Sequence, residues 1–72
     1  MELRQLEYFK TVGDLKNLSK ASQLLYVSQP ALSKSISSLE KELGVQLFER
    51  RNRKMTLTLY GQVFYHRVIR IL

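Results

Sequence analysis

The stretch from Ser28 to Gly44, SQPALSKSISSLEKELG, carries helix signals at both ends and along one side. Ser28 can cap the free amides of a first turn, where Pro30 is tolerated because its missing N–H would have no partner. Gly44 suits the left-handed residue that ends a helix. Apolar residues recur between these ends at intervals of four, three and four, which predicts a buried stripe: Leu32, Ile36, Leu39 and Leu43.

The other side of this predicted helix is slim and polar. Its leading end offers an amide, small hydroxyls and a lysine, at Gln29, Ser33 and Lys34, and it has no aromatic ring. No aspartate or glutamate occurs between Asp14 and Glu40, so a phosphate backbone can approach without repulsion. A helix of this width with these donors is suited to the major groove of DNA.

Two helices are predicted before this one. Apolar residues recur every three positions from Leu3 and indicate a first helix that ends near 13–17. Ser19 is expected to cap a short second helix, packed through Ala21, Leu24 and Leu25. The turn at residues 27–28 is so tight that the second and third helices must cross steeply, which is helix-turn-helix geometry.

After Gly44 the sequence changes its period. The runs VQLFER and KMTLT are rich in β-formers and flank a polar, basic stretch, which predicts a two-stranded hairpin with Met55, Leu57 and Leu59 on its apolar face. Thr58 can cap a last helix. The apolar stripe of this last helix comprises Tyr60, Phe64, Val68, Ile71 and Leu72, and it is widened by Val63 and Ile69. Because one small domain cannot cover so wide a stripe, part of it is expected to contact another chain.

Composition narrows the function classes. Twelve basic and six acidic residues give a net charge of +6, and residues 45–72 hold six basic side chains but one acidic. This excess favours a polyanionic partner. The chain has no cysteine, which excludes a disulfide framework and a zinc ribbon and makes the cytoplasm the default location. No apolar run approaches the roughly 20 residues of a membrane span, so no membrane partner is expected.

Catalytic and metal chemistry has little support in the sequence. His66 is the single histidine, and it is expected to be an exposed helical residue rather than a metal ligand. Glu40 and Glu42 lie two positions apart on a helix and point to different faces, so they do not form an acid/base pair. We therefore expect no enzyme, no metal site and no cofactor.

The run SKASQLLYVSQPALSKSISSLEKELGVQLFER, followed by RKMTLTLYG, closely resembles the N-terminal domain of LysR-type transcriptional regulators. The most specific pieces are SQPALS, LEKELGVQLFER and an L-T-x-x-G pattern that ends at Gly61. The resemblance covers essentially all 72 residues. It implies a mainly α, winged helix-turn-helix fold with three helices, a small two-stranded β wing and a C-terminal linker helix. The implied division is a DNA-binding domain at 1–58 and the start of a dimerisation helix at 59–72.

The resemblance also implies site residues. The family's base-reading and backbone-gripping positions match Ser28, Gln29, Pro30, Ser33 and Lys34. Lysine 34 stands where the family commonly has arginine, so bidentate reading of guanine is disfavoured. Further cations that would grip DNA are Lys20, Arg50, Arg51 and Arg53. Of these, Arg53 is expected to reach a minor groove.

Two other residues depart from the family pattern. Ser22 replaces an alanine near the crossing of the second and third helices, and its hydroxyl is expected to bond back to its own helix. Leu59 replaces a proline, which makes the entry to the linker helix less rigid.

The implied partners are those of a bacterial transcription factor. They are double-stranded DNA with an inverted-repeat operator, and a second copy bound through the linker helix, with a tetramer as a further form of the full-length protein. A small-molecule effector would bind only through a C-terminal domain that is missing here. Two alternatives stay open: a winged helix that contacts only proteins through its last helix, and attachment to a membrane surface through that basic amphipathic helix.

Overall fold

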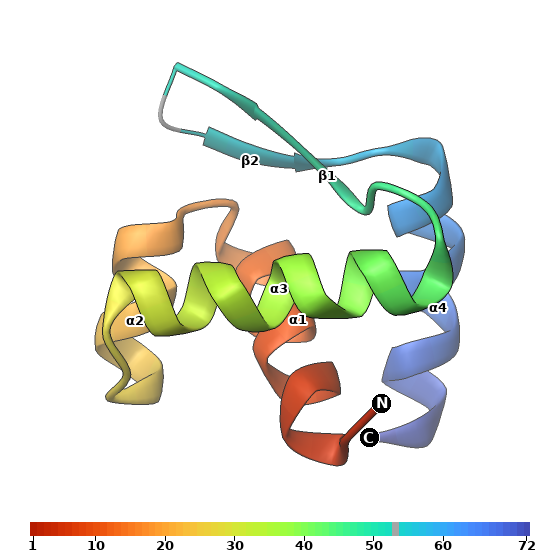
Figure 1. Cartoon of the computed structure of the whole chain (residues 1–72), viewed down its shortest axis with the longest axis horizontal. Coiled ribbons are helices and arrows are strands. Elements are labelled where there is room, and N and C mark those ends of the chain that lie inside the picture. Colours follow the sequence, from red (N-terminus) through yellow and green to blue (C-terminus); the bar gives the residue numbers. More distant parts are fainter. Residues whose placement is uncertain (53) are drawn as a thin grey trace.

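The computed structural model describes residues 1–52 and 54–72. Within them the chain forms a mainly helical fold with one antiparallel hairpin (Figure 1). The elements are α1 (Leu3–Leu15), α2 (Leu18–Leu25), α3 (Gln29–Leu43), β1 (Phe48–Arg51), β2 (Lys54–Leu57) and α4 (Leu59–Ile71). This order confirms the predicted helix-turn-helix followed by a wing, a name used below for the hairpin of β1 and β2.

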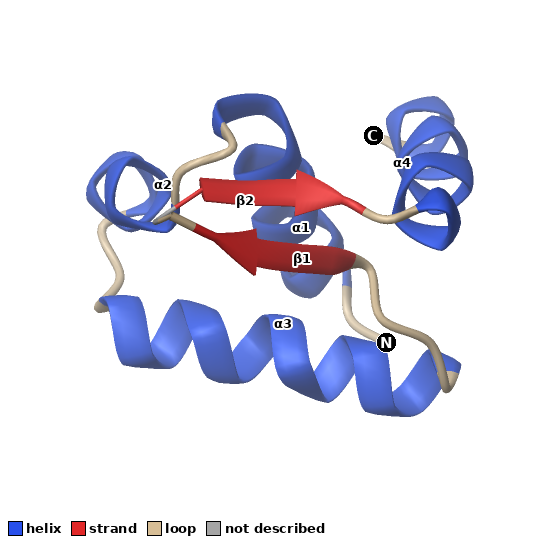
Figure 2. Cartoon of the chain, turned by 90° about the horizontal axis from the view of Figure 1, so that it is seen from above, coloured by secondary structure: helices blue, strands red, loops and turns tan. Residues whose placement is uncertain are grey.

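Helix α1 lies at the centre, where it packs against α2, α3, α4 and β2. Figure 2 shows the wing above α1, with α2 at one end, α4 at the other and α3 alongside. Phe9 of α1 is fully buried, and its ring lies 5.3 Å from that of Phe48 and 5.1 Å from that of Phe64. One aromatic side chain thus joins the first helix to the wing and to the last helix.

The ends of α3 follow the sequence signals. Ser28 Oγ accepts a hydrogen bond from the Ala31 amide over 3.2 Å, and Gly44 adopts the left-handed conformation with φ of 73°. Leu32, Ile36 and Leu39 are buried. These contacts confirm both caps and the buried stripe as far as Leu39, whereas Leu43 at its end is half-buried.

The start of α2 corrects one prediction. Asn17, not Ser19, caps this helix: its side-chain oxygen accepts from the Lys20 amide over 2.9 Å. Both residue types cap well, and here the extended backbone falls at Asn17, which leaves Ser19 inside the helix. Leu24, which was predicted to pack beside Ala21, is 64% exposed, whereas Ala21 is buried.

The hydroxyl of Ser22 behaves as expected. Ser22 is buried in α2, and its Oγ donates to the Ser19 carbonyl over 2.8 Å. A polar group in the core is thereby satisfied within its own helix.

The wing alternates between an inner and an outer face. Phe48 pairs with Leu57 and Arg50 pairs with Met55, and both Phe48 and Met55 are buried against the helices. Because successive strand residues point to opposite faces, Glu49 and Arg51 lie on the outer face. Leu59 does not extend this pattern as predicted: it is the first residue of α4 and is 74% exposed.

Hydrogen bonds attach the wing to the helices. The Glu40 carboxylate accepts from the amides of Leu47 and Phe48, over 2.7 and 3.2 Å. On the other side, the Met55 amide donates to the Lys16 carbonyl over 3.2 Å. Both strands are therefore held to the helical body.

Thr58 connects the wing to α4. Its Oγ1 accepts from the Gly61 amide over 3.0 Å, which confirms it as the cap of the last helix. The same hydroxyl donates to the Gln46 carbonyl over 2.6 Å. The backbone amide of Thr58 donates to the Leu47 carbonyl over 3.0 Å.

A polar cluster fastens α4 to α1. The Asp14 carboxylate accepts from the Tyr65 hydroxyl and from Lys10 Nζ, the latter over 2.7 Å. Partial burial acts to raise the pKa of Asp14. The hydrogen bonds from Lys10 and Tyr65 and the attraction to the Lys10 charge act in the opposite direction, and together they hold the pKa of Asp14 below its ordinary value of 3.8. The hydrogen bond to Asp14 likewise raises the pKa of Lys10.

This lowered pKa predicts an acid-dependent contribution to stability. The ionised carboxylate is favoured in the folded state, so its contribution is fully present above pH 3.8 and is lost as the pH falls through the lower folded-state pKa. Replacing Asp14 by asparagine should lower the melting temperature slightly at pH 7, because the cluster is exposed to solvent. Melting curves recorded from neutral to acidic pH should show that the melting temperatures of the unaltered chain and of Asp14→Asn converge below pH 3.8. A difference that grows on acidification would contradict this assignment.

Candidate nucleic-acid interface

The tip of α3 presents its polar side chains to solvent because the opposite side of the helix is buried. Ser28, Gln29, Pro30 and Lys34 are exposed, and Ser33 is half-buried. The buried partners are Leu32 and Ile36. All five residues predicted at this tip therefore share one accessible end of one helix, called the recognition tip below.

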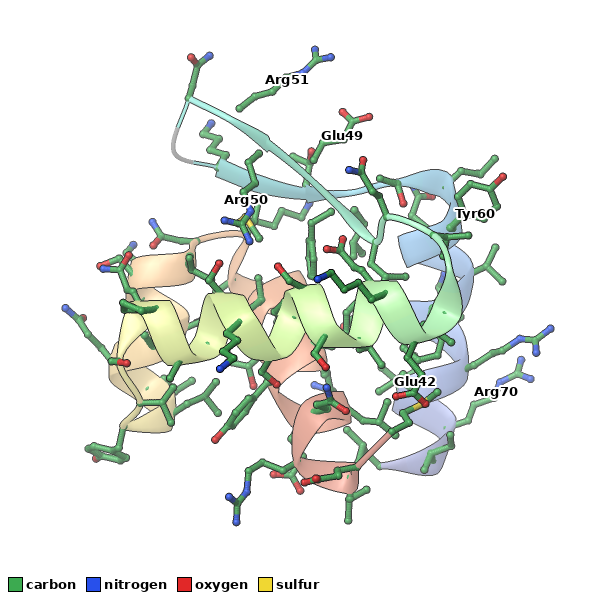
Figure 3. All side chains as sticks on the ribbon, viewed as in Figure 1. Glu42, Glu49, Arg50, Arg51, Tyr60 and Arg70 are labelled. Atoms are coloured by element: carbon green, nitrogen blue, oxygen red, sulfur yellow. The ribbon has the colours of Figure 1, made fainter. Side chains whose placement is uncertain are left out.

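The two described arginines of the wing point in opposite directions. Arg50 extends from β1 toward α3, and its Nη2 donates to Ser33 Oγ over 2.9 Å, whereas Arg51 points away from α3 (Figure 3). The Arg51 side chain is 83% exposed and lies 3.9 Å from Glu49 on the same outer face. Arg53, predicted to reach a minor groove, lies outside the described residues.

A hollow of about 420 Å³ lies where the start of α2, the recognition tip and the wing meet. Its lining includes Gln29 from the tip, Arg50 and Lys54 from the wing, and Asn17 and Ser19 at the start of α2. Carboxylates are absent from its described lining. Lys20 follows in the first turn of α2 and is exposed. Cations and neutral hydrogen-bonding groups from three elements thus surround one concave surface, which suits an anionic ligand.

The residues predicted for dimerisation differ in how far they are exposed. Tyr60, Ile71 and Leu72 are 63%, 64% and 46% exposed, but Val68 is fully buried. Phe64 is half-buried and its ring packs against Phe9.

Helix α4 packs against the body of the fold through one side. Gly61 and Val68 lie seven positions apart, hence on one side of the helix, and both are buried. The predicted apolar stripe therefore includes residues of the core as well as residues exposed to solvent. The exposed residues of α4 include Leu59 and Val63, which line an apolar groove of about 370 Å³ between α4 and the end of α3.

Other chemistry gains no support from the described residues. Within residues 1–52 and 54–72, no three histidine, cysteine, aspartate or glutamate side chains gather as a metal site. His66 is exposed on α4. In the same residues, no helix is both long enough and apolar enough to cross a membrane.

Comparison with known proteins decides the family. The family model described as the bacterial regulatory helix-turn-helix protein, lysR family, matches residues 3–62. The chain belongs to the LysR family. An uncharacterized HTH-type regulator of Bacillus subtilis, YybE, is 48% identical over 68 residues, which are 94% of this chain and 23% of that protein. BenM of Acinetobacter baylyi is 44% identical over all of this chain and 24% of its own length.

Solved structures of LysR-family domains match the whole fold. The DNA-binding domain of CbnR, solved with DNA, has a TM-score of 0.94 and 42% identity over 99% of this chain and 82% of that one. The BenM domain, solved with benA site 1 DNA, has a TM-score of 0.94 and 44% identity over 99% and 83%. The chain spans about a quarter of the length of its curated LysR relatives.

Proposed function

We propose that this chain binds double-stranded DNA in a sequence-specific manner, as the N-terminal part of a bacterial LysR-type transcriptional regulator. The observation that carries the proposal is the hollow shared by the recognition tip and the wing, which is lined by the exposed Gln29 of the tip and by two cations of the wing, Arg50 and Lys54. The likeness to two LysR-family domains solved with DNA supports it. The recognition tip is a single helix end with exposed polar side chains, and the major groove is wide enough to admit an α-helix.

The side chains that we propose to contact DNA divide into two roles. Lys20, Lys34 and Arg51, together with Arg53, supply charge that neutralises phosphates and grips any sequence. Gln29 reads a base edge, since its amide carries a donor and an acceptor that match adenine N6 and N7. Ser28 and Pro30 set the backbone that presents Gln29.

Gln29 provides the sharpest test of base reading. Replacing it by alanine should weaken binding to the preferred duplex by about 1–3 kcal/mol, because one bidentate contact is lost. Binding to random duplex DNA should change little, since Gln29 carries no charge. Titration of both duplexes at equal salt would measure the two losses. Equal losses would assign Gln29 to backbone gripping instead.

We propose that residues 1–58 form the DNA-reading unit and that residues 59–72 begin a linker helix that pairs with a second copy. The exposed apolar residues Leu59, Tyr60, Val63 and Ile71 support such pairing, with Leu72 beyond them. In the full-length protein we expect a tetramer built on this dimer and an effector-binding domain. The protein would act on DNA in the cytoplasm, without catalysing a reaction or holding a cofactor.

Selection of bound sequences from a random duplex library tests the proposal directly. The chain should enrich an inverted repeat, because two recognition tips related by a two-fold axis read two half-sites. Enrichment of a single half-site would support sequence-specific DNA binding by one chain without a dimer. Absence of salt-sensitive duplex binding would contradict DNA binding and favour a protein-contacting winged helix.

A further inference from the structure

A side-chain hydrogen bond joins the wing to the recognition tip. Arg50 Nη2 donates to Ser33 Oγ over 2.9 Å, although the two residues lie 17 positions apart in the chain. Figure 3 shows Arg50 directed from the wing toward α3. The bond therefore connects the two elements to which the proposed function assigns contact with DNA.

The strand pattern explains why Arg50 makes this contact. Arg50 lies two positions after the buried Phe48 and opposite the buried Met55, so it belongs to the inner face of the wing. Arg51, one position later, lies on the outer face beside Glu49. The two neighbouring arginines carry the same charge but meet different surroundings.

The chemistry of the two groups fixes the direction of the bond. A guanidinium has donors and no acceptor, so the Ser33 oxygen must accept. The hydroxyl keeps its own proton, and no acceptor for that proton is found among the residues that the structure describes. Ser22 shows the opposite arrangement, because its hydroxyl donates to a carbonyl of its own helix. Arg50 thus leaves the Ser33 proton available to a group outside the chain.

We propose that Arg50 is a positioning residue that holds the Ser33 hydroxyl as a donor to DNA, rather than a phosphate ligand in its own right. This inference rests on the proposed function. The groups that would receive the Ser33 proton are acceptors: a phosphate oxygen, a purine N7, guanine O6 or thymine O4. The amino groups of adenine and cytosine are donors, and this hydroxyl would disfavour them.

Arg50 is exposed to solvent, and we expect this hydrogen bond to restrain its side chain before DNA arrives. A long side chain that is already fixed in the free chain loses less freedom on binding. The same hydrogen bond restrains the rotamer of Ser33, because its Oγ accepts from Arg50. Ser33 therefore also loses less conformational freedom when it binds DNA. Removing either partner should therefore remove most of the same contribution to affinity.

A double-mutant cycle tests this dependence. We would compare the unaltered chain, Ser33→Ala, Arg50→Met and the double variant on the duplex enriched by the unaltered chain. Methionine keeps an unbranched side chain beside Met55 but has no donor. Each single variant should bind about tenfold more weakly, and the double variant should also lose about tenfold, because both changes remove one coupled unit. Far-ultraviolet circular dichroism would confirm that all four chains are folded.

Salt dependence separates positioning from phosphate binding. Under the proposal, Arg50→Met leaves the slope of log K against log salt unchanged. Two results would overturn the proposal: a double variant that binds about a hundredfold more weakly, and a salt slope that Arg50→Met reduces by about 0.9. Together they would make Arg50 an independent phosphate ligand.

Arg51→Met is the matched control. Because Arg51 and Ser33 are not hydrogen-bonded to each other, the fold-losses of DNA affinity caused by Arg51→Met and by Ser33→Ala should multiply in the double variant. Failure of the unaltered chain to bind duplex DNA would overturn the proposed function and this inference together, whereas binding with multiplied losses would overturn the inference alone.

Discussion

Replacing Gly61 by alanine should destabilise the folded chain by about 3 kcal/mol, because α4 has no room for a side chain at this position. A Cβ at Gly61 would overlap the carbonyl oxygen of Leu47 and lie 3.0 Å from its carbonyl carbon. That carbonyl is backbone, and it already accepts from the Thr58 amide, so it cannot swing aside as a side chain would. Helix α4 must shift away from the 44–47 loop instead.

Thermal or urea unfolding would measure this loss. For a domain of this size, a loss of about 3 kcal/mol lowers the melting temperature by roughly 12–24 °C. Gly13→Ala is the matched control, since a Cβ there meets the Tyr65 ring at 3.2 Å, a contact that a shift of a few tenths of an ångström relieves. The control should change stability by less than about 1 kcal/mol, helped by the better helix propensity of alanine. Equal effects at both glycines would show that the Leu47 carbonyl does not limit the packing of α4.

The second large effect is expected at Glu40. Its carboxylate accepts from two backbone amides, those of Leu47 and Phe48, at a half-buried position. Glu40→Ala would leave both amides without this acceptor, and a hydrogen bond to a charged group contributes about 1.5–3 kcal/mol. We expect a loss of about 3 kcal/mol in the free energy of unfolding, together with weaker DNA binding as the wing loosens from α3.

Glu42 provides the control for Glu40 on the same helix. Its carboxylate lies 3.0 Å from the amino group of Met1, and both groups are partly exposed. Because surface ion pairs contribute little, Glu42→Ala should change stability by less than about 1 kcal/mol. Unfolding of the two variants under one set of conditions would compare them. A loss at Glu42 as large as that at Glu40 would indicate a general effect of charge on α3.

Much of this fold could be predicted because its signals are local. The cap at Ser28, the left-handed Gly44 and the buried stripe of α3 depend on residues within one or two turns. The cap of α4 at Thr58 is equally local. The start of α2 was missed because Asn17 and Ser19 are both good caps, and only the backbone decides between them.

Contacts between distant elements could not be predicted from local patterns. The bond from Arg50 to Ser33, the bond from Tyr65 to Asp14 and the acceptor role of Glu40 depend on how strands and helices pack. The alternation of inner and outer residues in the wing was the available signal for Arg50, since Phe48 is apolar two positions earlier. The burial of Val68 likewise depends on which side of α4 meets α1.

The junction at Thr58 determines how two copies of this chain would meet DNA. Strand β2 ends at Leu57 and α4 begins at Leu59, and Thr58 between them is hydrogen-bonded on both sides. A single hydrogen-bonded residue therefore separates the wing from α4, and we expect the two elements to move together. In a pair of chains joined through α4, the distance between the two recognition tips would follow from the angle at which the two helices cross. A change at the helix pairing would then alter the preferred number of base pairs between half-sites, without touching any residue that contacts a base.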